Sequence, residues 1–277
     1  MGKRIIGIAV VLSCTVTAQT PSWQRRAPET RPLELFHALH VSMLPTAQTL
    51  QKGDLEFEVS HRFIPTIDSG ADSFYGIDGP ANIRLALDYA ATDRLLVTVG
   101  RTNVQDNMEL QIKYKALQFR HDRFPVLVSL RGGSAYNSEI FAPVKSSGRR
   151  WQFYGQLVAN TLVGEKLGIG VVPSYLYNSH IFCCDPQYSF TLGSYVQYYA
   201  SPHWSVFAEW NPTVSGWRKT YDSFSLGLEL ETGGHFFKII LTNNDKLNSS
   251  LFLAGADRDF WSGDMRFGFM ITRLIKL

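Results

Sequence analysis

Acidic and basic side chains recur at alternate positions in several stretches of this chain. In residues 54–63, Glu56, Glu58 and Arg62 alternate with apolar residues. Side chains of a β-strand point alternately to two faces, so these charges would gather on one polar face. Such charges can form a paired network that fills an interior, or they can line a polar channel that selects a small hydrophilic solute. The candidate lumen-lining residues are Glu56, Glu58, Arg62, Arg84, Asp88, Glu109, Lys113, Arg131, Glu209, Glu229 and Lys238.

Histidine and cysteine, which could bind a metal, lack the spacing of a metal site. His61 and His235 fall on the apolar faces of their segments, close to a segment end, where an interfacial position is expected. Cys183 and Cys184 are neighbours that could form a strained vicinal disulfide, or bind a metal together with His180. A fourth ligand of standard spacing does not accompany them. We therefore expect no metal and no cofactor.

The charged positions belong to a series of segments that alternate apolar and polar residues from residue 54 onward. In residues 107–118, for example, Leu110 separates Glu109 from Gln111. A period of two indicates β-strands with one apolar and one polar face. Turn residues divide the region into about twelve segments, each long enough for a tilted membrane-spanning strand. The expected strands are 54–64, 80–90, 94–103, 107–118, 124–133, 150–162, 165–177, 188–199, 203–212, 222–232, 234–243 and 264–276.

The connections between these strands alternate between tight and long. Residues 91–93 form a short turn, whereas 65–79, 133–149 and 244–263 are long and rich in Gly, Ser, Asp and Asn. Transmembrane barrels have short periplasmic turns and longer outer loops, while a soluble sandwich has no reason to sort its loops by end. The last strand has an apolar face and suits closure of a barrel by pairing with the first strand. The sequence therefore predicts an all-β fold, an antiparallel up-and-down transmembrane β-barrel of about twelve strands.

The first residues predict export. A short basic start precedes an apolar run that is too short to span a bilayer, and Val16-Thr17-Ala18 fits a cleavage site. Residues 1–18 are therefore expected to be a signal peptide. A buried N-terminal helix, or a lipoprotein cleaved before Cys14, agrees less well with this pattern.

The stretch from residue 19 to residue 53 has no clean period and contains four prolines. Leu33–Leu44 could form a short amphipathic helix or an extra strand. We expect residues 19–53 either to lie in the periplasm or to fold into the barrel as a plug, and residues 54–277 to form the barrel itself.

Composition agrees with an exported barrel. Hydrophobic residues make up 45% and aromatic residues 13% of the chain, and the formal net charge of +3 is small. This charge gives no reason to expect nucleic-acid binding, and no later segment approaches the roughly twenty apolar residues of a membrane helix. The expected location is the outer membrane of a Gram-negative bacterium. The expected partners are outer-membrane lipid, lipopolysaccharide, the outer-membrane assembly machinery and a possible small polar solute.

Three function classes are open to such a barrel. The first is a pore for small polar solutes or a side-chain-filled barrel. The second is an outer-membrane lipid hydrolase, which needs a nucleophile beside a histidine. Ser60 precedes His61, but neighbours in a strand point to opposite faces, and no GxSxG or HExxH motif stands in a suitable context. The third is an adhesin or structural barrel that acts through its outer loops. We expect no catalytic residue and no enzymatic activity.

Several short strings stand in a specific order along the chain. They are His61-Arg62-Phe63, residues 76–89, Gly100-Arg101, Lys113-Tyr114, Pro173-Ser174-Tyr175, residues 209–212, residues 231–237, Thr242-Asn243, Gly268-Phe269 and Thr272-Arg273. In this order they resemble a family of Gram-negative outer-membrane β-barrel proteins that is catalogued as a domain of unknown function. The resemblance extends along the chain from about residue 36 and implies the barrel and the outer membrane, with no activity attached. One departure is visible, because the family tends to carry a His-Arg-Asn string where this chain has Tyr177-Asn178-Ser179.

Overall fold

The protein is represented by a computed structural model that describes residues 33–140, 147–183 and 185–276. Each of the twelve expected strands is present at its expected place, which confirms the all-β prediction. The strands are β1 (Leu55–Phe63), β2 (Ala81–Thr92), β3 (Leu95–Thr102), β4 (Asn107–Phe119), β5 (Val126–Asn137), β6 (Trp151–Val163), β7 (Leu167–Tyr177), β8 (Tyr188–Tyr199), β9 (Trp204–Asn211), β10 (Thr213–Gly216), β11 (Ser223–Glu231), β12 (His235–Thr242) and β13 (Arg266–Ile275).

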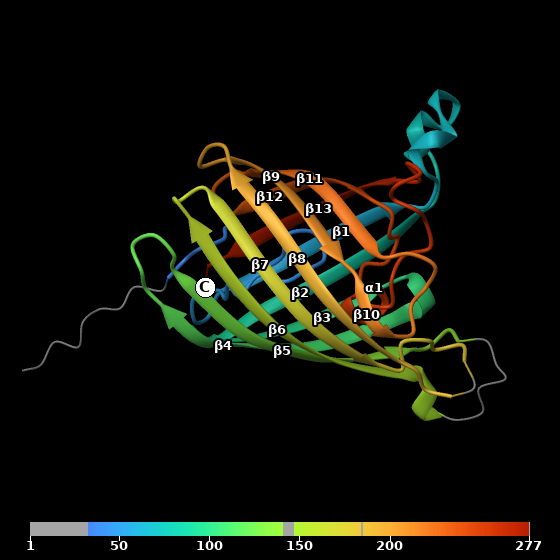
Figure 1. Cartoon of the computed structure of the whole chain (residues 1–277), viewed down its shortest axis with the longest axis horizontal. Helices are drawn as coiled ribbons and strands as arrows, with labels where there is room; N and C mark the ends of the chain where they lie inside the picture. The colour runs from blue at the N-terminus through green and yellow to red at the C-terminus, as the bar shows by residue number, and fades with distance from the viewer. Residues whose placement is uncertain (1–32, 141–146, 184, 277) are drawn as a thin grey trace, which may run out of the picture. The chain divides into compact units, whose positions relative to one another are not determined.

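The sheet closes on itself as an antiparallel up-and-down barrel (Figure 1). β1 pairs with β13 from Leu55↔Ile275 to Arg62↔Gly268, as expected for closure by the first and last strands. β10 continues β9 beyond Pro212, because both pair with β8, so the thirteen strands build a twelve-stranded barrel. Among the described strands, each one except the short β10 pairs on both sides, as a membrane-spanning sheet requires because lipid offers no hydrogen bonds.

The two faces of the barrel differ as the period of two predicts. Leu85, Leu110 and Leu228 are 49%, 49% and 46% exposed on the outer face. Their neighbours Arg84, Glu109 and Glu229 are buried inside. An apolar outer face and a polar interior are typical of a barrel whose outside contacts hydrocarbon.

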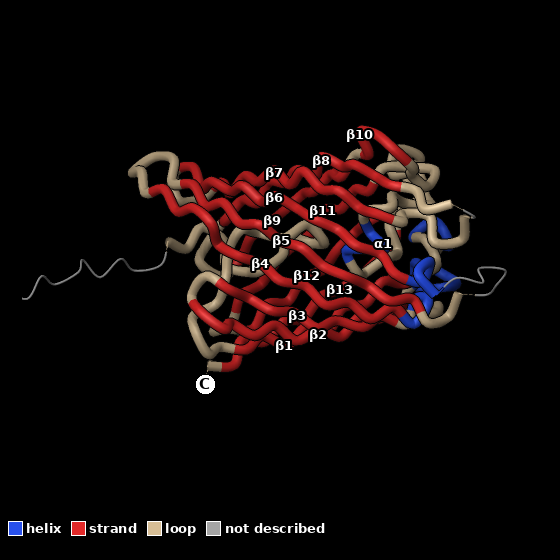
Figure 2. Tube along the Cα trace, turned by 90° about the horizontal axis from the view of Figure 1, so that it is seen from below, coloured by secondary structure: helices blue, strands red, loops and turns tan. Residues whose placement is uncertain are grey.

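Long loops and short turns lie at opposite ends of the barrel (Figure 2). The β2–β3, β6–β7 and β11–β12 turns lie at one end, together with the C-terminal end of β13. The other end carries the long loops and the short helices. These helices are η1 (Ile67–Ser69), η2 (Ala71–Gly76), η3 (Val104–Asp106), η4 (Ser147–Arg150) and α1 (Ser249–Phe252). No helix in the described part of the chain is both long enough and apolar enough to cross a bilayer.

The prediction of a helix or strand over Leu33–Leu44 is wrong. These residues form bends, with a single β-bridge between His40 and Pro45. The reason is that side chains of the barrel satisfy the main-chain groups of this segment, so it does not need the hydrogen bonds of a helix. The signal-peptide prediction for residues 1–18 lies outside the described residues, as does Cys184 and with it the disulfide prediction.

The two histidines of the apolar faces do not meet inside the barrel. The ring of His61 stacks on Phe269 with centroids 4.5 Å apart, and His235 stacks on Phe237 at 6.3 Å. Both histidines are half-buried. Within the described residues, no group of three or more His, Cys, Asp or Glu side chains could hold a metal ion.

Candidate functional site

The lumen of the barrel collects the charged side chains that the alternation selected. All eleven candidate lumen residues are buried, each at most 5% exposed. They come from β1, β2, β4, β5, β9, β11 and β12. Their inward position follows from the alternation, since most of them lie between outward-facing apolar neighbours.

Two ion pairs connect part of this set. Arg84 Nη1 lies 2.5 Å from Glu58 Oε1, and Lys238 Nζ lies 3.0 Å from Glu229 Oε2. Both pairs are almost completely shielded from solvent. Buried charges need such partners, so these pairs belong to the paired-network alternative.

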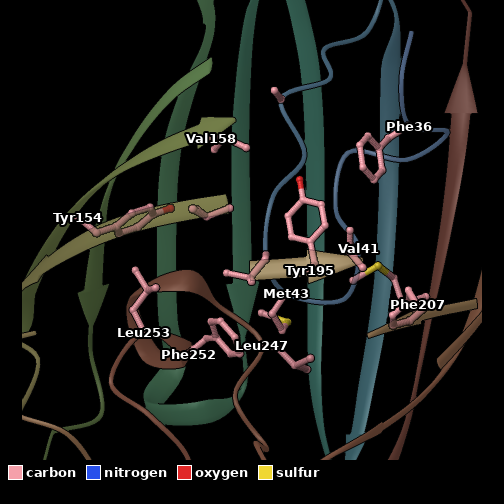
Figure 3. Close-up of a cluster of buried hydrophobic side chains, with 14 of the residues drawn as sticks. Phe36, Val41, Met43, Tyr154, Val158, Tyr195, Phe207, Leu247, Phe252 and Leu253 are labelled. Atoms are coloured by element: carbon pink, nitrogen blue, oxygen red, sulfur yellow. The ribbon is translucent and has the colours of Figure 1, made fainter. Parts of the chain in front are cut away.

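One part of the lumen wall has a different character. The sequences of β6, β7 and β8 contain no Asp, Glu, Lys or Arg. Their inward side chains include Tyr154, Val158, Val172, Leu176 and Tyr195, which belong to one buried hydrophobic cluster (Figure 3). We call β6–β8 the uncharged wall. The alternation of charged residues does not predict this wall, although the run of three strands without a charge is a signal that could have revealed it.

Residues 35–49, which we call the inner plug, occupy the lumen. Except for His37, all of these residues are buried. Leu35, Phe36, Val41 and Leu44 join the hydrophobic cluster of the uncharged wall. Of the two positions expected for residues 19–53, periplasm or barrel interior, residues 35–49 have the interior, and residues 19–32 lie outside the described residues.

A carboxylate of the barrel holds the middle of the inner plug. Glu209 accepts hydrogen bonds from the main-chain N–H groups of Ser42, Met43 and Leu44, at 3.0–3.1 Å. Arg62 donates to the hydroxyl of the same Ser42 at 3.1 Å. Hydrogen bonds to a charged acceptor are stronger than neutral ones, so Glu209 is the principal anchor of this segment.

Ammonium groups hold main-chain carbonyls of the same segment. Lys238 donates to the carbonyl oxygens of His40 and Val41, the second at 2.8 Å. Lys113 donates to Thr46 O at 3.2 Å. Both lysines are among the candidate lumen residues, and both therefore bind the plug in addition to shaping the charge of the lumen.

Neutral polar groups complete the cradle around the end of the inner plug. Asn160 accepts a hydrogen bond from the N–H of Ala47, and Ser129 donates one to the carbonyl oxygen of Ala47 at 2.7 Å. The hydroxyl of Tyr195 donates to Pro45 O at 3.2 Å. The buried main-chain groups of this irregular segment are thus paired with barrel side chains, as burial requires.

Two glycines of the uncharged wall make room for the inner plug. A Cβ at Gly168 would lie 2.6 Å from the ring of Phe36, and one at Gly193 would lie 2.8 Å from Leu44. The ring of Phe36 packs edge-on against Tyr195, with centroids 5.6 Å apart. We call these hollows the Phe36 notch and the Leu44 notch.

A second segment fills the lumen from the loop end. Residues 243–256, which we call the outer plug, include α1 and are buried apart from Lys246. Glu109 accepts from the N–H groups of Ser249 and Ser250 at 3.3 and 3.0 Å. Arg84 donates to Asn248 at 2.8 Å. A carboxylate of the barrel therefore binds main-chain N–H groups of the outer plug, as Glu209 does for the inner plug.

A small cavity remains where the two plugs approach each other. Its lining combines polar groups of both plugs with charged residues of the barrel. Figure 3 shows Met43 of the inner plug and Leu247 of the outer plug in the same region. The lining residues are His40, Ser42, Met43, Glu58, Arg84, Arg131, Leu247, Ser249 and Met270.

The remaining candidate residues have other surroundings. Asp88 accepts from Thr98. Arg131 donates to Gln156 at 2.8 Å and to Gln111. Glu56 lies opposite Asp88 in the β1–β2 register, so two carboxylates face the lumen side by side.

A sequence model described as a membrane-bound beta barrel domain (DUF5777) matches residues 36–275. No curated protein matches this sequence.

Solved structures resemble the chain in architecture. The NanC porin is 9% identical with a TM-score of 0.49, covering 80% of this chain and 100% of that one. The COG4313 outer membrane channel of Pseudomonas putida F1 is 13% identical with a TM-score of 0.48, covering 83% and 98%. Omp33 of Acinetobacter baumannii is 12% identical with a TM-score of 0.42, covering 81% and 99%. Likenesses of this size carry no information about activity.

Proposed function

Since this chain belongs to the DUF5777 family of membrane-bound β-barrel domains, we propose that it is an outer-membrane channel for small polar solutes whose lumen is closed at rest by its two plugs. The barrel lies in the outer membrane, where closed transmembrane sheets of this kind occur. Around it we expect outer-membrane lipid and lipopolysaccharide, and we expect the assembly machinery to insert it.

The observation that carries this proposal is the way Glu209 binds the inner plug. Three main-chain N–H groups of a bend, and no secondary structure, are all that the carboxylate holds. A segment without helix or sheet has little cooperativity of its own, so it can leave its site without unfolding the barrel. The lumen that it vacates is lined by charges of both signs, which suits hydrated solutes.

The paired-network alternative predicts a permanently filled barrel with the same contacts. It differs in its energetics, because a permanent filling would not respond to the loss of a single anchor. Opening that depends on Glu209 therefore separates a gated channel from an inert barrel.

The test is conductance of the refolded chain in planar bilayers, compared with Glu209→Gln. The variant keeps the shape of the side chain and removes its charge, so we expect the open probability to rise about tenfold, by the ~1.5 kcal/mol of a charged hydrogen bond. Glu165→Gln is the matched control, because Glu165 is exposed in the β6–β7 turn, and it should leave conductance unchanged. Silence of both the native chain and Glu209→Gln, with the barrel folded, would contradict the channel.

The same samples test the lipid-hydrolase alternative. Release of fatty acid from lipopolysaccharide or phospholipid by the refolded chain would replace the channel proposal with an enzyme. We propose that no such release occurs, since the rings of His61 and His235 stack on Phe269 and Phe237, whereas the histidine of a hydrolase contacts a nucleophile.

A further inference from the structure

The lumen binds the inner plug chiefly through its main chain. Glu209 accepts main-chain N–H groups, while Lys238 and Lys113 donate to main-chain carbonyls. Asn160 and Ser129 bind both sides of the Ala47 peptide. These groups are common to all peptides, so this mode of recognition depends little on sequence.

Side chains of the inner plug are recognised differently, by apolar hollows. Phe36 fills its notch at Gly168 against Tyr195, and Leu44 fills its notch at Gly193. The uncharged wall offers further apolar surface from Val158 and Val172, and Val172 lies opposite Gly193 in the β7–β8 register. Such a wall suits apolar side chains of moderate size.

We propose that the lumen is a binding site for short peptides with apolar side chains, and that the inner plug occupies it as an internal mimic. The carboxylate and ammonium groups of the barrel would bind the peptide main chain, and the two notches would take its side chains. This inference rests on the proposed function, since a peptide reaches the site when the plug leaves.

The charge of the lumen favours a peptide over a simple ion. Among the eleven candidate lumen residues, six are acidic and five are basic, so neither an anion nor a cation finds a strong excess of opposite charge. A capped peptide carries no net charge and offers donors and acceptors together. Both the acceptor Glu209 and the donors Lys113 and Lys238 then keep partners when the plug is displaced.

The test uses the refolded full chain with Phe36→Ala and Leu44→Ala combined, which empties both notches and leaves Glu209 intact. The probe is a capped tripeptide, Leu-Phe-Leu, added during planar-bilayer recording. Three matched compounds accompany it: the same tripeptide N-methylated at each amide, a capped Gly-Ser-Gly, and phenylhexanoate. Circular dichroism confirms that each variant has folded as a sheet.

We expect Leu-Phe-Leu to block the current at a concentration about tenfold lower than any of the three matched compounds, the size of one charged hydrogen bond. Because Glu209 holds the plug as well as the peptide, the comparison is between two peptides: adding Glu209→Gln to the variant should remove the tenfold advantage of Leu-Phe-Leu over its N-methylated form. Equal block by the N-methylated peptide would overturn main-chain recognition. Equal block by Gly-Ser-Gly would overturn the role of the notches, and stronger block by phenylhexanoate would replace the peptide by an amphipathic anion.

A second readout separates this inference from the channel proposal. If the folded variant passes no current, equilibrium dialysis of radiolabelled Leu-Phe-Leu against it measures binding directly. Saturable binding that exceeds that of the N-methylated peptide, with an excess that Glu209→Gln removes, supports the peptide site while the channel fails. Binding that does not exceed that of the N-methylated peptide overturns the peptide site.

Discussion

Glu209 and Met43 lie 166 residues apart in the chain, yet the N–H of Met43 is 3.0 Å from both carboxylate oxygens of Glu209. This contact connects Met43, in the segment before the first strand, to Glu209 in β9. It holds the inner plug against the barrel wall in the closed state. Changes on either side of the contact should therefore alter both stability and gating.

The Phe36 notch predicts a steric way to displace the inner plug. In Gly168→Ala, the added methyl group lies 2.6 Å from the ring of Phe36 in the present packing, so the ring must move. Overpacking of this kind costs ~1–3 kcal/mol. We expect proteases to cleave the inner plug faster in Gly168→Ala than in the native chain, as read by mass spectrometry.

Gly155→Ala is the control for that experiment, because a Cβ at Gly155 meets no atom within 4 Å. It should leave cleavage unchanged. Equal protection of the inner plug in native chain and Gly168→Ala would show that Phe36 does not anchor it.

Lys238 predicts a large effect on stability. Its ammonium group forms an ion pair with Glu229 at 3.0 Å and donates hydrogen bonds to two main-chain carbonyls of the inner plug. Lys238→Met leaves Glu229 buried without its cation, and breaking one side of a buried pair costs ~3–5 kcal/mol. Urea unfolding of the refolded barrel should show this loss, whereas Lys166→Met in the exposed β6–β7 turn should not.

A double variant tests whether the loss comes from the stranded charge. Lys238→Met with Glu229→Leu removes both charges and should recover part of the stability, since an apolar replacement of a buried pair is often neutral. No recovery in the double variant would mean that the plug carbonyls, and not Glu229, need the ammonium group.

The outer plug predicts a pH dependence. Burial by itself would raise the pKa of Asp245, but Lys246, whose Nζ lies 2.8 Å from Oδ2, together with Lys219, lowers that pKa below its usual value. A carboxyl whose pKa is lowered on folding stabilises the folded state above its unfolded pKa and loses that contribution as the pH falls through its folded pKa. The outer plug should therefore loosen in the acid range below about 4, the ordinary pKa of an aspartate.

Open probability measured across this range checks the prediction. Asp245→Asn should raise the open probability at neutral pH and flatten its acid dependence. An identical pH profile in Asp245→Asn and the native chain would assign the acid response to other carboxylates.

Strand order and orientation could be predicted from the sequence because both depend on local periodicity. Asn107–Phe119, for example, alternates polar and apolar residues from Asn107 to Lys115, and a one-residue shift would put Lys113 into lipid. The same rule placed Arg62 and Lys238 inside without any knowledge of their partners. The alternation of polar and apolar side chains depends only on residues that are adjacent in the chain, so it can be read from the sequence.

The contents of the lumen could not be predicted in this way. The contact between Glu209 and residues 42–44 joins distant segments through main-chain atoms, which carry no sequence signal. Residues 35–49 also lack the hydrogen-bonding pattern of any regular element, so propensity suggested a helix or strand for Leu33–Leu44 where the barrel itself supplies the partners. The Phe36 notch at Gly168 likewise depends on tertiary packing alone.

The hydrogen bonds that Glu109 and Glu209 accept from the two plugs predict that the plugs act as two gates in series. Glu109 holds N–H groups of the outer plug, and Glu209 holds those of the inner plug. If the plugs move independently, the open probability of the channel is the product of the two separate opening probabilities. Glu109→Gln and Glu209→Gln should then each raise it about tenfold, and the double variant about a hundredfold. Single-channel recording of the four chains measures this. If the double variant is no more open than either single variant, the two plugs move together. The cavity that Met43 and Leu247 both line would then be the place where the plugs are coupled.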